Sequence, residues 1–303
     1  TKGVVLSTGE YPSYSDISTY HMAACAIDTA IRNAISVGGS LEHLAILDNT
    51  CWCSSYDPIR LGQLVEAMRA CYDYAVGYGT PYISGKDSMF NDFKGYDDKG
   101  NPVTISIPPT LLISAIGVIP DLNKSVTPEF KVAGDVIYVL GETHDELGAS
   151  EYYKILANND VTKIGVNVPK VDFKKNIKTY KSLEKAVKSE LVASSLSIVS
   201  GGLACAIAKS SVGGMLGTNI NIKNLEGTAA TLDAKLFSES QGRILVTVAK
   251  KNQKAFEKVV KGIPCTLLGA VSNSKKFIIT DGKNKVIDTD IEKLNTSYHN
   301  FSN

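Results

Sequence analysis

The sequence predicts an α/β (mixed α+β) protein built from two consecutive domains. Its 303 residues are enough for about two domains of ordinary size. In both halves, short apolar runs of strand length alternate with longer segments that have helical periodicity. Residues 120–135 interrupt this alternation, because they contain two prolines and no apolar period. We therefore place a domain boundary there and predict domains at 1–125 and 126–303.

The first half begins with a tyrosine-rich segment, residues 10–21, that we expect to pack as an arm or a strand. A helix is predicted over residues 20–39, where apolar side chains recur at helical spacing before a pair of glycines. Shorter patterns predict a strand at 44–49, a helix at 61–79, a strand at 82–84, a hairpin or mobile loop at 93–102, and two strands within 104–119 that Pro108-Pro109 separates.

The second half repeats the alternation of strands and helices. A strand is predicted at 136–141, and an acidic loop follows it at 142–150. The later patterns predict a helix from about Glu151, helices at 180–194, 200–210 and 253–262, strands at 243–249 and 265–271, and a closing hairpin at 276–289.

The charge balance and the cysteines argue against several classes of function. With 32 Lys and Arg against 31 Asp and Glu, the chain has no net field that would recruit nucleic acid or an acidic membrane. Six cysteines without a disulfide-like framework predict reduced thiols and a cytoplasmic protein. No apolar run approaches the roughly 18 residues of a spanning helix, and we expect no signal peptide. Because the chain opens at Thr1 rather than at Met, we expect a fragment of something longer.

The most informative motif is the polar run that ends the predicted strand at 82–84. Gly85 lets backbone N–H groups approach an anion, Lys86 supplies a point charge, and Asp87 can hold a metal before the small polar Ser88. The alternative is a simple strand-to-loop turn, because Gly, Asp and Ser are also the commonest turn residues. A lone motif of this length is weaker than a full phosphate-binding loop.

Two polar residues of the first half lie in apolar surroundings. Asp48 is predicted at the C-terminal end of its strand, where α/β folds commonly bind ligands, or else it caps the following segment. Asn33 is a poor helix former inside an apolar helix, so it either satisfies a nearby loop or reaches a metal or phosphate. The four histidines have no spacing typical of a catalytic triad or a zinc site.

A second polar group precedes the strand predicted at 243–249. Its possible phosphate-binding members are Glu239, Ser240, Gln241 and Arg243. Arg243 could fork onto a phosphate or pair with Glu239. The glycines at 201 and 202 open a predicted helix and fit either anion binding or close packing.

Taken in order along the chain, these segments resemble the C-terminal half of phosphoribosylformylglycinamidine synthase, the ATP-dependent amidotransferase of purine synthesis. The resemblance covers most of the chain and is carried by "STGEYPSYSDISTYHMAACAIDTAIRNAISVGG", "LAILDNTCW", "YISGKDSM", "IPPTLLISAIGVIPD", "VTPEFKVAGDVIYVLGETHDELGASEYY" and "LFSESQGR". It implies a two-domain module like that of aminoimidazole ribonucleotide synthetase. The N-terminal α/β domain of such a module pairs across a dimer-like interface, and a C-terminal α/β domain follows it.

In this family two such modules form an internal pseudo-dimer, and the second completes the ATP and substrate site of the first. The resemblance implies contacts with ATP and its Mg²⁺ from Asp48 as the metal ligand, from Gly85 and Lys86, and from the further candidates Asp87 and Asn33. It implies contact with formylglycinamide ribonucleotide from Ser88. The segment from Glu239 to Arg243 is similar to a phosphate-binding segment of the catalytic half.

An auxiliary nucleotide site of the family is expected to be weak or absent here. Related sequences have a Glu in place of Thr29, a metal-binding Asp in place of Ser197, a Ser in place of Val199 and an acid in place of Ser200. Because Mg²⁺ needs carboxylates, each hydroxyl that replaces one removes a negative charge from the site.

The resemblance implies part of a ligase, inactive as an isolated fragment, that makes formylglycinamidine ribonucleotide, ADP and phosphate. Its inputs would be formylglycinamide ribonucleotide, ATP and glutamine-derived ammonia. The expected partners are the catalytic N-terminal half of the same enzyme and a glutaminase subunit or domain, and the isolated chain is expected to form a homodimer. Two alternatives remain open: a non-catalytic structural half-module, and a homodimeric ATP-using synthetase or kinase of the wider group.

Overall fold

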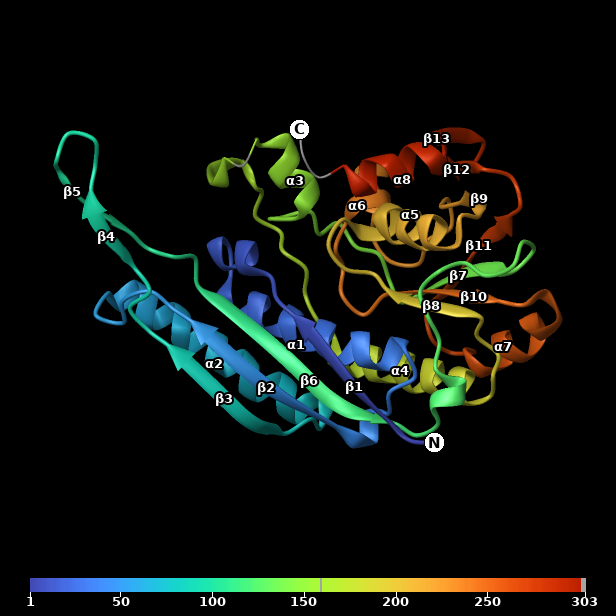
Figure 1. The fold of residues 1–303 in the computed structure, drawn as a ribbon, viewed down its shortest axis with the longest axis horizontal. Helices are drawn as coiled ribbons and strands as arrows, with labels where there is room; N and C mark the ends of the chain where they lie inside the picture. Colours follow the sequence, from blue (N-terminus) through green and yellow to red (C-terminus); the bar gives the residue numbers. More distant parts are fainter. Residues whose placement is uncertain (159, 301–303) are drawn as a thin grey trace.

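The computed structural model describes residues 1–158 and 160–300, and its mixture of helices and strands confirms the predicted α/β class (Figure 1). The strands are β1 (Gly3–Gly9), β2 (Leu44–Cys51), β3 (Tyr82–Ser88), β4 (Phe93–Tyr96), β5 (Pro102–Ile105), β6 (Thr110–Ile119), β7 (Val136–Leu140), β8 (Ser194–Ser197), β9 (Gly217–Asn221), β10 (Ile244–Val248), β11 (Cys265–Ser272), β12 (Lys276–Asp281) and β13 (Asn284–Asp290). The α-helices are α1 (Thr19–Ser36), α2 (Pro58–Tyr78), α3 (Glu151–Leu156), α4 (Phe173–Lys188), α5 (Gly202–Gly214), α6 (Leu232–Phe237), α7 (Gln253–Val259) and α8 (Ile291–His299). Short 3-10 turns are η1 (Pro12–Asp16), η2 (Leu41–His43), η3 (Leu122–Lys124), η4 (Val161–Lys163) and η5 (Lys250–Asn252).

The first sheet has the strand order β1-β6-β2-β3. Strand β6 pairs antiparallel with β1 and β2, whereas β3 pairs parallel with β2 and forms an edge of the sheet. Helix α2 is the crossover that a parallel pair requires, and with α1 it covers one face of the sheet. Ser18 begins α1 by accepting a hydrogen bond from the His21 N–H, and Gly79 ends α2 in the left-handed conformation that glycine favours.

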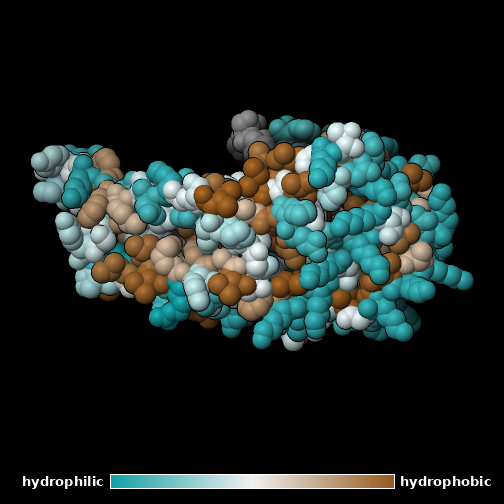
Figure 2. Space-filling view, turned by 90° about the horizontal axis from the view of Figure 1, so that it is seen from below, coloured by the Kyte–Doolittle hydropathy of each residue, from teal (hydrophilic) through white to brown (hydrophobic). Residues whose placement is uncertain are grey.

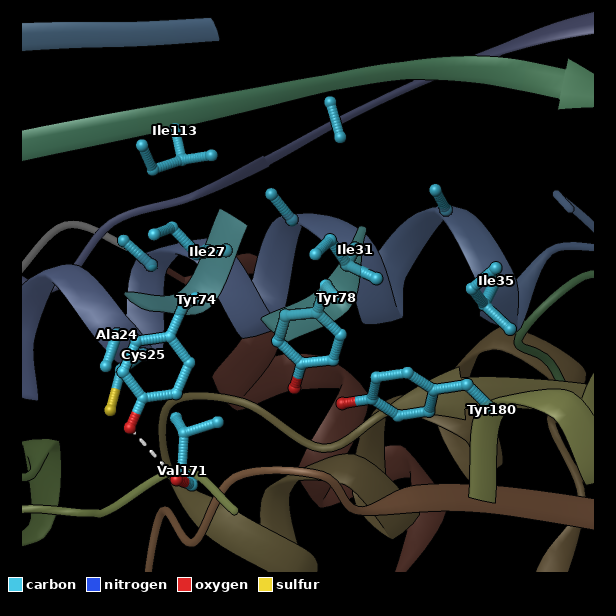
Figure 3. Packing of buried hydrophobic residues seen from close by; sticks show 14 of the residues in the cluster. Ala24, Cys25, Ile27, Ile31, Ile35, Tyr74, Tyr78, Ile113, Val171 and Tyr180 are labelled. Atoms are coloured by element: carbon cyan, nitrogen blue, oxygen red, sulfur yellow. Dashed lines mark hydrogen bonds between the residues drawn. The ribbon is translucent and has the colours of Figure 1, made fainter. Parts of the chain in front are cut away.

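The larger apolar core lies between this sheet and the helices. Ile31 of α1 packs in the same cluster as Ile113 of β6, and tyrosines close the cluster from the other side (Figure 3). Tyr74 of α2 donates a hydrogen bond to the Val171 carbonyl at 3.0 Å, and Tyr180 enters from α4. The core therefore continues from the first sheet into the second half of the chain.

The second sheet has the strand order β13-β12-β9-β11-β7-β10-β8, and all its pairs are antiparallel except β9 with β12. Helices α4 and α7 pack on one face, and α5 with α6 and α8 packs on the other. Helix α4 also contacts α1 and α2, so it joins the two sheets (Figure 1). The β4–β5 hairpin projects from the end of the first sheet (Figure 1).

Two strands of the first sheet are longer than predicted. Strand β3 continues through the polar motif to Ser88 and does not turn after Ser84, because its backbone pairs with β2 as far as Cys51. Asp48 consequently lies inside β2 rather than at its C-terminal end. The strand-to-loop turn considered for the motif is therefore wrong.

Other predicted elements also change. A helix is present where one was predicted at 180–194, but its bounds are wrong: α4 begins after its cap Asp172 and ends at Lys188, and residues 194–197 pair with β10 as strand β8. The tyrosine-rich segment forms η1 and the first turn of α1 rather than a strand. The domain boundary within residues 120–135 stays a prediction.

We call the face of the first sheet that α1 and α2 cover the inner face and the opposite one the outer face. The outer face carries an exposed apolar band: Val4 and Leu6 of β1 are 68% and 74% exposed, and they pair with Val118 and Ile116 of β6. Seen from below, hydrophobic side chains gather on the half that holds β2, β3 and α2, whereas the other half is mostly hydrophilic (Figure 2). An exposed apolar band of this kind typically marks a protein contact.

Candidate functional site

The polar motif of β3 lies beside β2, and the strand register decides which side chains share a face. Asn49 of β2 pairs with Lys86 of β3. On its other side, β2 places buried Ile113 beside Asp48 and half-buried Leu112 beside Asn49. Because neighbours across a ladder point to the same face, Asp48 faces the helices on the inner face. Asn49 and Lys86 belong to the outer face.

Lys86 and Ser88 form the polar end of the outer face. Lys86 is exposed, and within the described residues its ammonium makes no ion pair or hydrogen bond. Ser88 is half-buried, and its hydroxyl accepts a hydrogen bond from the Asn91 side-chain amide at 3.1 Å. The two side chains therefore present a free cation and a hydroxyl on the same face as the apolar band, at the opposite edge of the sheet.

Asp48 and Asp87 are on the inner face. Burial raises the pKa of Asp48, the Thr50 hydroxyl that donates to it at 3.2 Å lowers it, and the negative charge of Asp87 raises it again. Gly85 pairs with Asp48, and a Cβ atom there would lie 2.5 Å from the Asp48 carboxylate oxygen. The Asp48 carboxylate would therefore have to move aside for a side chain at position 85, and the glycine lets it lie across β3.

The two carboxylates fit Mg²⁺ only in part. Among residues 1–158 and 160–300, no group of three or more His, Cys, Asp or Glu side chains could hold a metal ion. Mg²⁺ is nevertheless often bound by one or two carboxylates, with waters and substrate phosphates as its remaining ligands. Asp48 and Asp87 can supply that minimal set.

Asn33 lies apart from this group. Its side-chain amide donates to the Thr8 carbonyl of β1 at 3.0 Å, which ties α1 to the edge of the first sheet. The amide therefore contacts a strand rather than a loop, and a role of Asn33 toward a metal or phosphate stays a prediction. The structure does not bring Asn33 together with Lys86 or Ser88.

The second candidate group is buried. Arg243 donates to two backbone carbonyls of its own segment and to the Thr143 hydroxyl at 3.1 Å, rather than to Glu239. Burial, reinforced by the positive charge of Arg32, lowers the pKa of Arg243 to about 10. All four members of this group are at most 6% exposed: Glu239, Ser240, Gln241 and Arg243.

The Glu239 carboxylate occupies the position that the glycine-led helix offers to an anion. It accepts the backbone N–H groups of Glu151 at 3.0 Å and Gly201 at 2.8 Å, which stand at the starts of α3 and α5. It also accepts the Tyr14 hydroxyl at 2.5 Å. Burial raises the pKa of Glu239, whereas these hydrogen bonds lower it. The protein's own carboxylate therefore satisfies these donors.

Sequence reasoning missed the ion pair at the centre of the molecule. Arg32 Nε lies 3.1 Å from Asp28 Oδ2, and both side chains are fully buried. Asp28 also accepts the Asn176 amide at 2.8 Å and the Tyr180 hydroxyl at 2.5 Å. Burial, followed by the charge of Asp28, raises the pKa of Tyr180 well above its ordinary value, so this hydroxyl stays a donor. The available signal was an Asp and an Arg four residues apart inside an apolar helix.

Thr29 belongs to the same network. Its hydroxyl lies 2.8 Å from that of Tyr11 and donates to Gln241 at 2.9 Å, and Tyr11 stacks on Tyr14. Ser197 ends β8, and its buried hydroxyl has no hydrogen-bond partner in the described part of the chain. The region expected to hold the auxiliary nucleotide is thus packed with protein side chains, and its weak or absent binding stays a prediction.

None of the helices in the described ranges is long and apolar enough to cross a membrane.

Comparison with known proteins places the chain. Residues 132–282 match the family described as AIR synthase related protein, C-terminal domain. The chain is 30% identical over 300 residues to the phosphoribosylformylglycinamidine synthase subunit PurL of Methanocaldococcus jannaschii. The aligned region covers 98% of this chain and 39% of that relative. The chain thus spans less than half the length of this relative.

Two solved structures share the fold. Thermotoga maritima PurL complexed with FGAR aligns with a TM-score of 0.78 and 18% identity, over 97% of this chain and 46% of that one. Thiamine-monophosphate kinase from Stenotrophomonas maltophilia aligns with a TM-score of 0.62 and 12% identity, over 95% and 86% of the two chains. The fold and the matches define an α/β module of the AIR synthase type. The chain therefore carries an AIR synthase related C-terminal domain at residues 132–282 and is similar over nearly its whole length to PurL.

Proposed function

We propose that this chain is the second module of a phosphoribosylformylglycinamidine synthase, an ATP-dependent ligase of purine biosynthesis. The identity with the PurL subunit extends over 98% of the chain, and the T. maritima PurL structures that share its fold include complexes with FGAR and with ATP. The observation that carries the proposal is the outer face of the first sheet, which holds free Lys86 and Ser88 at one edge and an exposed apolar band toward the other. Such a surface suits a half-site that another module completes.

The proposed reaction converts the amide of formylglycinamide ribonucleotide to an amidine. ATP phosphorylates the amide oxygen, and ammonia from glutamine then displaces the phosphate. Lys86 would neutralise charge on the phosphoryl group, and the Ser88 hydroxyl would orient the substrate. Catalysis of this type rests on positioning and charge neutralisation rather than on a protein nucleophile.

The metal would enter with the nucleotide and neutralise phosphate charge. Asp48 and Asp87 are the residues of this chain that would hold Mg²⁺. Because β3 is an edge strand, a triphosphate lying along its edge could reach side chains of both faces.

The proposed partners follow from the same surface. The catalytic N-terminal half of the enzyme would cover the apolar band on the outer face, and a glutaminase subunit or domain would deliver ammonia. Without that half, a second copy of this chain would cover the band as a homodimer. A synthase of purine biosynthesis would place the protein in the cytoplasm.

A second candidate function is a self-sufficient, homodimeric ATP-using synthetase or kinase. The observation in its favour is size, since the chain covers 86% of the thiamine-monophosphate kinase that shares its fold. The buried side chains around Thr29 count against it, because they occupy the region where the module's own nucleotide is expected.

The decisive experiment is Lys86→Ala in the complete synthase that contains this chain. We expect kcat/KM to fall by about 10²–10³-fold, the usual cost of removing one group that stabilises developing charge. The exposed Lys251 of η5 provides the matched control, Lys251→Ala, with unchanged activity. Unchanged turnover in Lys86→Ala would support the non-catalytic half-module.

Calorimetric titration of the isolated chain with ATP and Mg²⁺ tests the second candidate function, a homodimeric ATP-using synthetase or kinase. We expect no saturable binding, since the chain holds half of a site. Binding that Lys86→Ala abolishes would favour the homodimeric enzyme.

A further inference from the structure

We propose that Asn49 is a further ligand-contacting residue of this site, whose side-chain amide donates a hydrogen bond to the phosphoryl group that Lys86 neutralises. This inference rests on the proposed function, and it adds a residue that is not among the candidates of the sequence analysis.

The strand register brings Asn49 and Lys86 together. They are direct partners in the parallel β2–β3 ladder, where neighbouring strands lie about 4.8 Å apart. Both point to the outer face, as does Ser88, which pairs with Cys51 two residues further along. Asp48 precedes Asn49 in the sequence but faces the helices. Asn49 is therefore the β2 side chain that stands beside the cation.

The amide of Asn49 is free to bind a ligand. Its oxygen accepts only a long contact from the Cys51 thiol, at 3.9 Å. Its nitrogen donates no hydrogen bond within the described residues, although the side chain is half-buried. Asn is disfavoured in strands, and in the described part of the chain no protein acceptor of its amide nitrogen favours it at this position. A phosphoryl oxygen beside Lys86 would accept from this amide.

The chemistry of the amide allows two roles that a charge substitution separates. As a donor to phosphate, Asn49 uses its nitrogen, and a carboxylate in its place would repel the ligand. As a metal ligand it would use its oxygen, and a carboxylate would bind at least as well. The exposed cation next to it favours the donor role, because Lys86 would oppose a second cation.

The test uses the complete synthase with Asn49→Ala, Asn49→Asp and the control Asn284→Asp on exposed β13. A hydrogen bond to a charged group predicts that Asn49→Ala lowers kcat/KM by about 10–100-fold. Asn49→Asp should lower it further, and Asn284→Asp should leave it unchanged. The KM values for ATP and for formylglycinamide ribonucleotide, measured separately, show which of the two phosphate-bearing ligands loses affinity.

Three outcomes are distinct. If Asn49→Asp is as active as Asn49→Ala or more so, the donor role is overturned. If Lys86→Ala is impaired while Asn49→Ala and Asn49→Ser behave as wild type, this inference fails and the proposed function stands. If Lys86→Ala itself is fully active, the proposed function fails, and this inference with it. Thermal unfolding of each variant, with Asn49→Ser as the mildest change, confirms that the fold is retained.

Discussion

Replacing Arg32 with Met tests the buried ion pair that connects α1 to the second half of the chain. Met is close to Arg in length but carries no charge. In the wild type, Arg32 donates to Asp28 at 3.1 Å, to Gln241 at 2.7 Å and to the Arg243 carbonyl at 3.1 Å. The replacement leaves Asp28 as a buried carboxylate without its cation.

The expected cost follows from what remains around Asp28. Tyr78, Tyr180 and Asn176 continue to donate to it, so the carboxylate keeps these three hydrogen bonds and loses the one from Arg32 together with the compensating charge. Removing one partner of a buried pair typically costs about 3–5 kcal/mol. We therefore expect the free energy of unfolding to fall by about 3–5 kcal/mol.

Urea unfolding of four proteins measures this coupling: wild type, Arg32→Met, Asp28→Asn and the double variant. The double variant removes both charges, so its loss should be smaller than the sum of the single losses by about 1–3 kcal/mol. A cost below about 1 kcal/mol for Arg32→Met, or strictly additive losses, would refute the view that charge compensation holds these elements together.

Two further predictions concern the first sheet. Gly62 of α2 has open space around it, so Gly62→Ala should raise the free energy of unfolding by up to about 1 kcal/mol. Gly85→Ala should lower the free energy of unfolding, because a Cβ atom there would meet the Asp48 carboxylate. Chemical denaturation of both variants measures the two changes. Asp87→Asn removes a negative charge and should lower the pKa of Asp48, which carboxyl NMR titration measures. Because the folded pKa of Asp48 is raised, its contribution to stability is greatest in acid and declines as pH rises from the unfolded to the folded pKa. Asp87→Asn should make that decline smaller, and an unchanged pKa would show that the two carboxylates do not interact.

The sequence predicts the α/β class and most elements because their signals are local. The apolar period of α1, with Ser18 before it, lies within one segment of chain. The same holds for the short apolar runs of the strands. The polar residues of β3 have low strand propensity, so a local reading ends that strand early. Pairing with β2 overrides this preference, and it comes from a partner some 37 residues away.

The candidate site was predictable in composition but not in orientation. The sequence assigns Asp48 to one predicted strand and Lys86 to the end of the next, and the structure pairs these two strands. Which face each side chain occupies depends on register, and a shift of one residue exchanges the faces. That is why Asn49 is absent from the sequence-based candidates. The Asp28 network is equally hidden, since Tyr180 lies 152 residues away in the chain.

The buried polar region around Asp28 and Glu239 and the polar end of the outer face differ in whether their hydrogen-bonding groups have protein partners. Around Asp28 and Glu239, protein donors surround each carboxylate, so that region is complete without a ligand and serves to fix the fold. On the outer face, Lys86 and Asn49 keep unused donors that water satisfies at little cost. A module that covered this face without an anion would bury an unpaired ammonium, which costs several kcal/mol. Under the proposed function, phosphate binding and association of the two modules would therefore strengthen each other, because each removes a cost that the other would bear alone.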